Sequence, residues 1–259
     1  MKVKIIVATH KITAMPQNKD LYMPILVGAT QNFREGITFQ RDDEGINISA
    51  KNEFYSELTG LFWAWKNLKH CDAVGLVHYR RYLANKTHGS LTSVLNQSEV
   101  DHLLEENDII LPRKRHYYIE SNYSHYIHAH KEEALLVTKD IIKTKFPEYS
   151  DSFDQCMHHT SAHMFNMFVM KQQPFDEYCS WLFEVLELLE KKINLNEYLG
   201  QERRVFGYIS ELLLDVWITN HTYYYTEVHW VQLGSKHLVR KIISFMLRKM
   251  GFNNISTHF

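Results

Sequence analysis

The sequence predicts an α/β protein with a mixed, mainly parallel sheet flanked by helices, because two kinds of segment alternate along the chain. Short apolar runs rich in β-branched residues are typical of buried strands. The longer stretches between them repeat their apolar residues every three or four positions, as amphipathic helices do. Strands that alternate with helices favour parallel pairing. With 259 residues, of which 45% are hydrophobic, the chain is long enough for a sizeable core.

Five apolar runs are the expected strands, and three periodic stretches are the clearest helices. The expected strands are 3–8, 73–77, 108–111, 163–170 and 223–228. The expected helices are 52–68, 175–193 and 205–217. The stretch 85–98 is rich in Asn, Thr, Ser and Gly, which indicates a loop and a candidate mobile lid.

The charge of the chain is unevenly distributed, which suggests a body and a tail. The net charge is only −1, but no acidic residue follows Glu227, and five basic residues do. We expect one domain over residues 1–230, since no internal repeat or linker interrupts it, and a basic amphipathic tail over 231–259. The tail either lies in a membrane interface or docks on the body as a helix, and its lack of acids favours the membrane.

Composition excludes several classes of function. A near-neutral chain lacks the basic footprint of a nucleic-acid binder. Its three cysteines are far apart, so neither a disulfide framework nor a zinc ribbon is expected. A signal peptide and an apolar run of about 18 residues, the length of a membrane span, are both missing from the sequence. We therefore expect a cytoplasmic protein that is peripheral at the inner face of the cell membrane.

Polar residues that end the apolar runs are the candidate site, because ligands bind at the carboxyl ends of parallel strands. The first run ends in Ala8, Thr9 and His10. These residues either contact a nucleotide or simply form a polar turn. The central run continues into His78, Tyr79, Arg80 and Arg81. Two arginines at the end of a buried strand suit a phosphate anion or, alternatively, ordinary ion pairs.

Three further residues carry candidate polar chemistry. Asn166 is the one amide in an apolar run, and it binds either a sugar hydroxyl or the backbone of a bulge. Glu211 lies beside the apolar face of its expected helix, where a partly buried carboxylate has a raised pKa and serves as a general base. The competing interpretation is an ion pair with a nearby arginine. Glu57 is a similar case on the earlier helix.

Metal and nucleotide motifs are missing from the sequence. Sixteen histidines invite a metal hypothesis, but their spacings match no HExxH or related motif, which favours scattered histidines. Neither GxGxxG nor GxxxxGK[ST] occurs. GxSxG is also missing, which disfavours a serine hydrolase.

Several residue blocks, in order, resemble a bacterial family of capsular and exopolysaccharide glycosyltransferases that was long catalogued as a domain of unknown function. The resemblance covers about residues 3–228. The most specific blocks are His78–Tyr79–Arg80–Arg81 and the later Glu211–Leu212–Leu213. Other blocks contain Asn47 with Asn52, Glu57–Leu58–Thr59, Trp63–Ala64–Trp65, Asp108–Ile109–Ile110–Leu111–Pro112 and Asn166–Met167–Phe168.

This resemblance implies a GT-A-like, Rossmann-type nucleotide-sugar fold and an inverting hexosyltransferase. Some relatives are galactofuranosyltransferases that use UDP-galactofuranose. The acceptor implied is a lipid-diphosphate-linked glycan of capsule, exopolysaccharide or O-antigen synthesis. Most GT-A enzymes bind Mn²⁺ or Mg²⁺ through an Asp-x-Asp motif, whose place holds His78–Arg81 here. We therefore prefer a metal-independent reaction in which the arginines stabilise the leaving UDP.

The resemblance also implies roles for individual residues. Glu211 is the preferred general base, with Asp108 and Glu57 as alternatives. Ala8, Thr9 and His10 are expected to face the nucleotide, and Asn166 the sugar. Asn47, Asn52, His78 and Tyr79 are counted with the substrate-binding residues. The rival hypotheses are a non-catalytic module that binds a nucleotide sugar or glycan, and a glycoside hydrolase.

Overall fold

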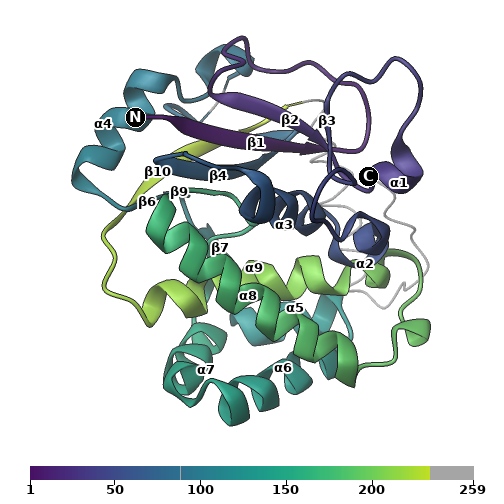
Figure 1. The fold of residues 1–259 in the computed structure, drawn as a ribbon. Coiled ribbons are helices and arrows are strands. Elements are labelled where there is room, and N and C mark those ends of the chain that lie inside the picture. Colours follow the sequence, from purple (N-terminus) through teal and green to yellow (C-terminus); the bar gives the residue numbers. More distant parts are fainter. Residues whose placement is uncertain (88, 234–259) are drawn as a thin grey trace.

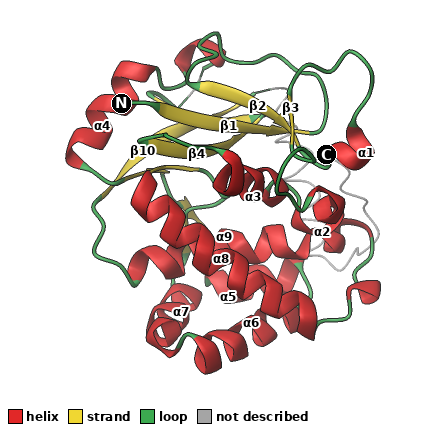
Figure 2. Ribbon diagram, viewed as in Figure 1, coloured by secondary structure: helices red, strands yellow, loops and turns green. Residues whose placement is uncertain are grey.

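A computed structural model describes residues 1–87 and 89–233 as a sheet with a layer of helices packed on one face (Figures 1 and 2). The strands are β1 (Val3–Thr9), β2 (Tyr22–Leu26), β3 (Gln40–Arg41), β4 (Ala73–His78), β5 (Arg81–Ala84), β6 (Ile109–Pro112), β7 (Arg115–His116), β8 (Ser161–Ala162), β9 (Phe168–Lys171) and β10 (Tyr225–Gln232). The α-helices are α1 (Ala29–Asn32), α2 (Asn52–Tyr55), α3 (Leu58–Asn67), α4 (Gln97–Glu106), α5 (Asn122–Ala129), α6 (Glu132–Lys145), α7 (Ser150–His158), α8 (Gln172–Lys192) and α9 (Val205–Thr219). None of the described helices is long and apolar enough to cross a bilayer.

The main sheet is mixed but mainly parallel, as the alternation of segments predicts. Its order is β3-β2-β1-β4-β5-β10-β6-β9, and only β5 and β9 run against the other strands. An additional pairing of β9 with β4 closes five of the strands into a ring. The ring was not predicted, because the sequence pattern does not show which strands pair. Within the ring, β4 and β5 share the single pair His78 and Arg81.

Gly75 lets β9 approach β4 closely. It lies opposite Val169 in the antiparallel pair. A Cβ atom at this position would lie 2.8 Å from the carbonyl oxygen of Phe168, closer than real Cβ atoms come to other atoms. The ring therefore needs glycine here.

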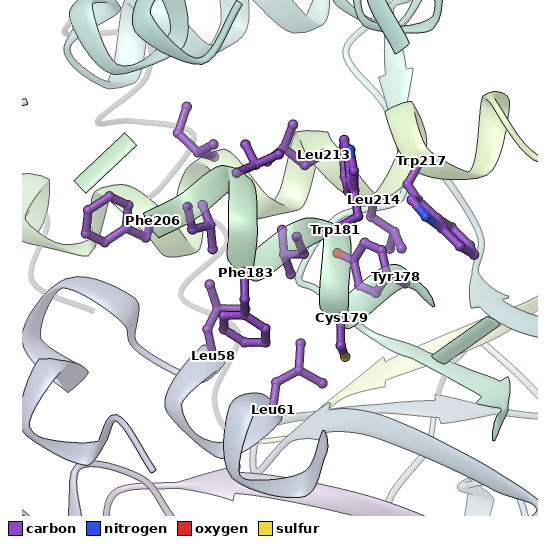
Figure 3. Packing of buried hydrophobic residues seen from close by; sticks show 14 of the residues in the cluster. Leu58, Leu61, Tyr178, Cys179, Trp181, Phe183, Phe206, Leu213, Leu214 and Trp217 are labelled. Carbon is purple, nitrogen blue, oxygen red and sulfur yellow. The ribbon is translucent and has the colours of Figure 1, made fainter. Parts of the chain in front are cut away.

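Helices pack on the sheet through a large apolar core (Figure 3). Leu58 and Leu61 of α3 lie beside Phe183 and Cys179 of α8, while Tyr178 of α8 faces Trp217 of α9 with 5.4 Å between ring centroids. Each large apolar side chain buried in this way contributes about 1.5–3 kcal/mol. A second cluster covers the opposite face of β1 and includes Val100 and Leu104 of α4. The periodic stretches that predict α8 and α9 are confirmed, with ends within a few residues.

Two expected elements are interrupted. The predicted strand 163–170 is wrong in its first half, because Phe165 and Asn166 adopt left-handed backbone angles, and β9 begins only at Phe168. The predicted helix 52–68 is broken at Ser56, whose φ of 51° and ψ of −127° separate α2 from α3. Nothing in the sequence marked these breaks, since none of the three residues is glycine.

The stretch 85–98 does not cover the carboxyl ends of the parallel strands. It follows β5, which runs antiparallel to its neighbours, so it starts at the opposite edge of the sheet. Leu95 is buried there and accepts a hydrogen bond from the Tyr22 hydroxyl at 2.8 Å. Gln97 donates to the carbonyl of Met1. The interpretation of this stretch as a lid is therefore wrong for its described part.

Strand β10 continues to Gln232 and buries Val231, so these first residues of the expected tail belong to the sheet. The rest of the expected tail, residues 234–259, lies outside the described residues.

Candidate active site

The carboxyl ends of β1 and β4 lie side by side, as the strand-end argument predicts. Ala8 pairs with His78, and the Tyr79 amide donates to the Ala8 carbonyl at 3.2 Å. His10 meets the Tyr79 ring edge-on, with 5.3 Å between ring centroids. Partial burial, and then the charges of Lys11 and Arg80, lower the pKa of His10. A neutral imidazole beside an aromatic ring can contact a planar base.

Thr9 has a local structural role at this edge. It is fully buried, and its hydroxyl donates to the Lys11 carbonyl at 2.7 Å while accepting from the Lys11 amide. These two bonds close the turn after β1, so the polar-turn interpretation holds for the Thr9 side chain.

A strained pair of residues, Phe165 and Asn166, lies at the centre of the site. Their φ angles are 78° and 52°, which cost about 1–3 kcal/mol each in residues other than glycine. The ring of His78 hydrogen-bonds the Phe165 carbonyl through Nε2. Burial lowers the pKa of His78, although the charge of Glu57 opposes the shift, and the ring donates this bond through Nε2–H. Strain of this kind is held in place by surrounding contacts and is concentrated at functional sites.

The side-chain amide of Asn166 connects Glu57, at the start of α3, to α9, so it does more than bond the backbone of a bulge. It is buried, and its Nδ2 donates to Glu57 Oε1 at 2.7 Å and to the Gly207 carbonyl at 3.1 Å. Its Oδ1 is buried without a hydrogen-bond partner among the described residues. A buried acceptor without a partner is costly, so the Asn166 Oδ1 is suited to accept a hydrogen bond from a ligand hydroxyl.

Glu57 is a buried carboxylate that is held in its ionised form. Burial alone would raise the pKa of Glu57, but His78, Arg204 and the Asn166 amide outweigh it and lower the pKa. Arg204 lies 3.6 Å from Glu57 Oε2, and its Nε donates to the Ser56 hydroxyl. The break at Ser56 thus places Glu57 and Arg204 in one network.

Glu211 has the opposite electrostatic environment and is partly buried on α9. Burial and then the negative charge of Glu57 raise the pKa of Glu211 to about 7, although a backbone bond to Phe165 and the charges of Arg81 and Arg204 oppose the shift. A carboxylate with a pKa near neutrality is a suitable general base. The sequence argument for Glu211 predicted this raised pKa.

Two arginine side chains are associated with this carboxylate pair. Arg81 lies over the Phe165 ring at 4.3 Å and is influenced by both Glu211 and Glu57. Its Nε is buried and has no partner among the described residues, which leaves a donor for an anion. Arg204, whose side chain is 48% exposed, is the second cation. Arg80 is exposed and lies over the Tyr79 ring.

Three expected site residues lie elsewhere or only support the site. Asp108 stands at the amino end of β6, at the opposite edge of the sheet, where it pairs with Lys171 at 3.1 Å. The Asn47 side chain bonds only within its own turn, to the backbone of residues 43, 45 and 49. Asn52 donates to the Ser56 carbonyl and the Thr59 hydroxyl, so it fixes the break that positions Glu57.

A cavity of about 50 Å³ beside Glu211 was missed by the sequence reasoning. Its wall contains Tyr117, Asn122, His125, Tyr126, His130, Met164, Tyr208, Glu211 and Leu212. Two of its histidines belong to the group dismissed as scattered. Their proximity in the sequence, within and just after α5, was the available signal.

The sequence reasoning also missed a buried group of one histidine and two carboxylates. His163 is buried, and its two ring nitrogens face Asp215 and Glu227. Burial opposes ionisation of Asp215, but the hydrogen bond and charge of His163 lower its pKa. Asp215 also accepts from the His163 amide at 2.9 Å. This group connects α9 and β10 to the segment that contains Phe165.

Among the described residues, no group of three or more His, Cys, Asp or Glu side chains is arranged to hold a metal ion.

Comparison with known proteins agrees with the residue blocks. A solved structure described as the WbbM bifunctional glycosyltransferase, in its apo form, is similar with a TM-score of 0.82 and 31% sequence identity. The similarity covers 91% of this chain but 46% of that one, so the chain spans about half the length of WbbM. No curated protein matches the chain. Residues 4–222 match the family described as "Domain of unknown function (DUF4422)", and the chain belongs to this family.

Proposed function

We propose that this protein is an inverting glycosyltransferase that moves a hexose from a UDP-sugar to a glycan acceptor. The observation that carries the proposal is Glu211, a carboxylate in the wall of a cavity whose pKa is about 7 and is influenced by the charges of Arg81 and Arg204. The similarity to a bifunctional glycosyltransferase supports it. A GT-A-like arrangement is consistent with the mixed sheet and with strand ends that meet at the site.

In the proposed reaction, an acceptor hydroxyl attacks the anomeric carbon of the donor while Glu211 takes its proton. The bond between that carbon and the β-phosphate oxygen breaks, and UDP leaves with the electron pair. Charge develops as in glycoside hydrolysis, with an oxocarbenium-like sugar. Glu57 is already engaged by Asn166 and Arg204, which leaves Glu211 as the single base and favours inversion.

Arg81 and Arg204 are proposed to bind the diphosphate and stabilise the leaving group. Arg81 is suited to this task because its buried Nε has no partner among the described residues. Arg80 is exposed at the same edge and extends the positive charge toward solvent. Preorganised donors aimed at developing charge are an effective source of catalysis. We propose that they act without Mn²⁺ or Mg²⁺.

The finer assignments follow the family resemblance. We propose UDP-galactofuranose as the first donor to test and a lipid-diphosphate-linked glycan as the acceptor, in capsule, exopolysaccharide or O-antigen synthesis. The basic residues after Glu227 would hold the enzyme at the inner membrane surface. Truncation after Leu233 should then weaken binding to vesicles that contain anionic lipid, and unchanged binding would reject this role.

The test is incubation of the full chain with UDP-galactofuranose, UDP-galactose or UDP-glucose and alkyl glycoside acceptors. Release of UDP together with a product heavier by one hexose supports transfer. Binding of UDP-sugar without turnover would instead indicate a binding module. Cleavage of a glycan without nucleotide would indicate a glycoside hydrolase, the other function that two carboxylates can serve. Activity that is lost with EDTA and restored by Mn²⁺ would overturn the metal-independent reaction.

A further inference from the structure

We infer that the cavity beside Glu211 is the subsite that binds the acceptor sugar, an inference that rests on the proposed function and deepens it. The cavity is built from four separate parts of the chain, one of which contributes Met164. Tyr117 follows β7, Asn122 and His125 belong to α5, and Tyr208 and Glu211 lie one turn apart on α9. None of these residues except Glu211 was part of the predicted site.

Two stacked pairs of rings fix the walls of the cavity. Tyr117 stacks on His125 with 3.8 Å between centroids, and Tyr208 stacks on His130 at 3.9 Å. Burial lowers the pKa of His130, although Glu202 opposes the shift, so the ring is neutral near pH 7. Rings stacked in this way are held in position without a ligand, which is the condition for a preformed binding site.

The cavity also has polar atoms that await a partner. Asn122 is 2% exposed, and its Nδ2 donates to the carbonyls of Cys156 and Ser161. This leaves its Oδ1 buried with no hydrogen-bond partner among the described residues, and the Tyr117 hydroxyl is in the same state. Buried polar atoms are almost always satisfied in a protein. Both atoms belong to residues of one cavity wall, which points to a ligand or water as the partner.

These groups match the chemistry of a sugar. The ring walls, with Met164 and Leu212, offer apolar surface for C–H groups, while Asn122 accepts from a hydroxyl and Tyr117 can donate to one. A volume of about 50 Å³ holds only a few water-sized groups, so it accommodates hydroxyl groups of one sugar rather than a whole glycan.

The position of Glu211 distinguishes the acceptor from the donor. Arg81 and Arg204, the proposed diphosphate site, both influence Glu211, and neither of them lines the cavity. Glu211 itself forms part of the cavity wall. A hydroxyl bound in the cavity is therefore beside the base that must take its proton, whereas the diphosphate needs the arginines. The cavity thus serves the acceptor.

The test compares Tyr117→Phe and Tyr208→Ala with Tyr123→Phe as a matched control. Tyr123 lies on α5 beside Asn122, but it bonds the exposed Glu132 and does not line the cavity. The assay measures transfer from UDP-galactofuranose, UDP-galactose or UDP-glucose to octyl β-D-galactopyranoside, octyl β-D-glucopyranoside and octyl β-D-mannopyranoside. We expect the acceptor KM to rise about tenfold in Tyr208→Ala and about threefold to tenfold in Tyr117→Phe. The donor KM should change less than twofold in Tyr117→Phe, and neither KM should change more than twofold in the control. Because the Arg204 guanidinium lies over the Tyr208 ring at 5.5 Å, Tyr208→Ala should also raise the donor KM, but by less than its acceptor KM.

The outcomes separate this inference from the proposed function. An unchanged acceptor KM in both cavity variants, with a wild type that transfers sugar, overturns the subsite alone. An equal rise in the donor and acceptor KM in both variants also overturns it, because that result indicates a general structural role. A wild type that transfers no sugar to any of the three glycosides overturns the proposed function, and the subsite with it.

Discussion

A buried carboxylate, Asp42, and a partly buried one, Glu211, show how the same chemical group serves structure in one region and chemistry in another. Asp42 accepts four hydrogen bonds, from the amides of Gly28 and Ala29 and from the hydroxyls of Ser49 and Thr59, at 2.5–2.9 Å. Those bonds fix the turn before α1 to the helices that follow.

Glu211 has a backbone bond to Phe165, a neighbouring negative charge, and a pKa raised to about 7. Asp42 is held by four donors in a structural network. Burial and the negative charge of Glu57 instead bring the pKa of Glu211 close to neutrality, where a carboxylate can exchange a proton.

The largest effect should come from removing the proton acceptor. Glu211→Gln keeps the shape of the side chain but abolishes its basicity, so kcat should fall by about 10²–10⁴-fold. UDP binding, measured by calorimetry, should change less than threefold. Glu57→Gln is the matched comparison, because it disturbs the Asn166 and Arg204 contacts and should also reduce the folded fraction. A Glu211→Gln enzyme with more than half of wild-type kcat would reject the assignment.

The next effect concerns the cations around Glu211. Arg81→Lys retains the charge but loses the planar fork, so kcat should fall by roughly 10–100-fold and UDP should bind more weakly. The control is Arg113→Lys, an exposed arginine elsewhere in the chain, for which neither value should move. Equal behaviour of the two variants would show that Arg81 holds no phosphate.

On the structural side of the comparison, Asp42→Asn should reduce stability rather than chemistry. The amide leaves two of the four donors without an acceptor, which should lower the free energy of unfolding by about 3 kcal/mol or more. Urea denaturation measures this change. Activity per folded molecule should stay within about twofold, and a specific loss of kcat without loss of stability would place Asp42 in the reaction.

A smaller effect is the pH dependence of stability. The pKa of Glu211 is raised in the folded state, so its contribution to stability is complete below the unfolded pKa, near 4.5, and is lost as the pH rises through about 7. Glu211→Gln has no carboxylate at this position, so its stability should not fall in this way as the pH rises. Between pH 4 and pH 8 the variant should therefore gain about 3 kcal/mol of unfolding free energy relative to wild type, measured by urea denaturation at both values. A constant difference would mean that the pKa is not raised.

The sequence predicted the parts of this molecule that depend on local pattern. β1, β4 and β6 were found because each is a short apolar run, and Glu211 because it lies beside an apolar helix face. Phe165 and Asn166 could not be predicted, since their left-handed angles are imposed by contacts with His78 and Glu57 that are distant in sequence.

Other features required the folded chain as well. Asp42 lies in a run of charged residues that is typical of a solvated turn, and only the fold brings Thr59 and Ser49 to it. The cavity joins α5 to α9, some 80 residues apart, so spacing rules for metal ligands could not find it. Asp108 was chosen for its place in a family block, but its end of the strand is the wrong one.

The measurement that tests Glu211 as the base most directly is the pH dependence of kcat/KM for the acceptor, from pH 5 to pH 9. In wild type, kcat/KM should rise tenfold per pH unit below about 7 and level off above it, because the free enzyme must be deprotonated at Glu211. In Glu211→Gln this limb should disappear. A wild-type profile that is flat across this range, or a limb that persists in Glu211→Gln, would contradict the assignment.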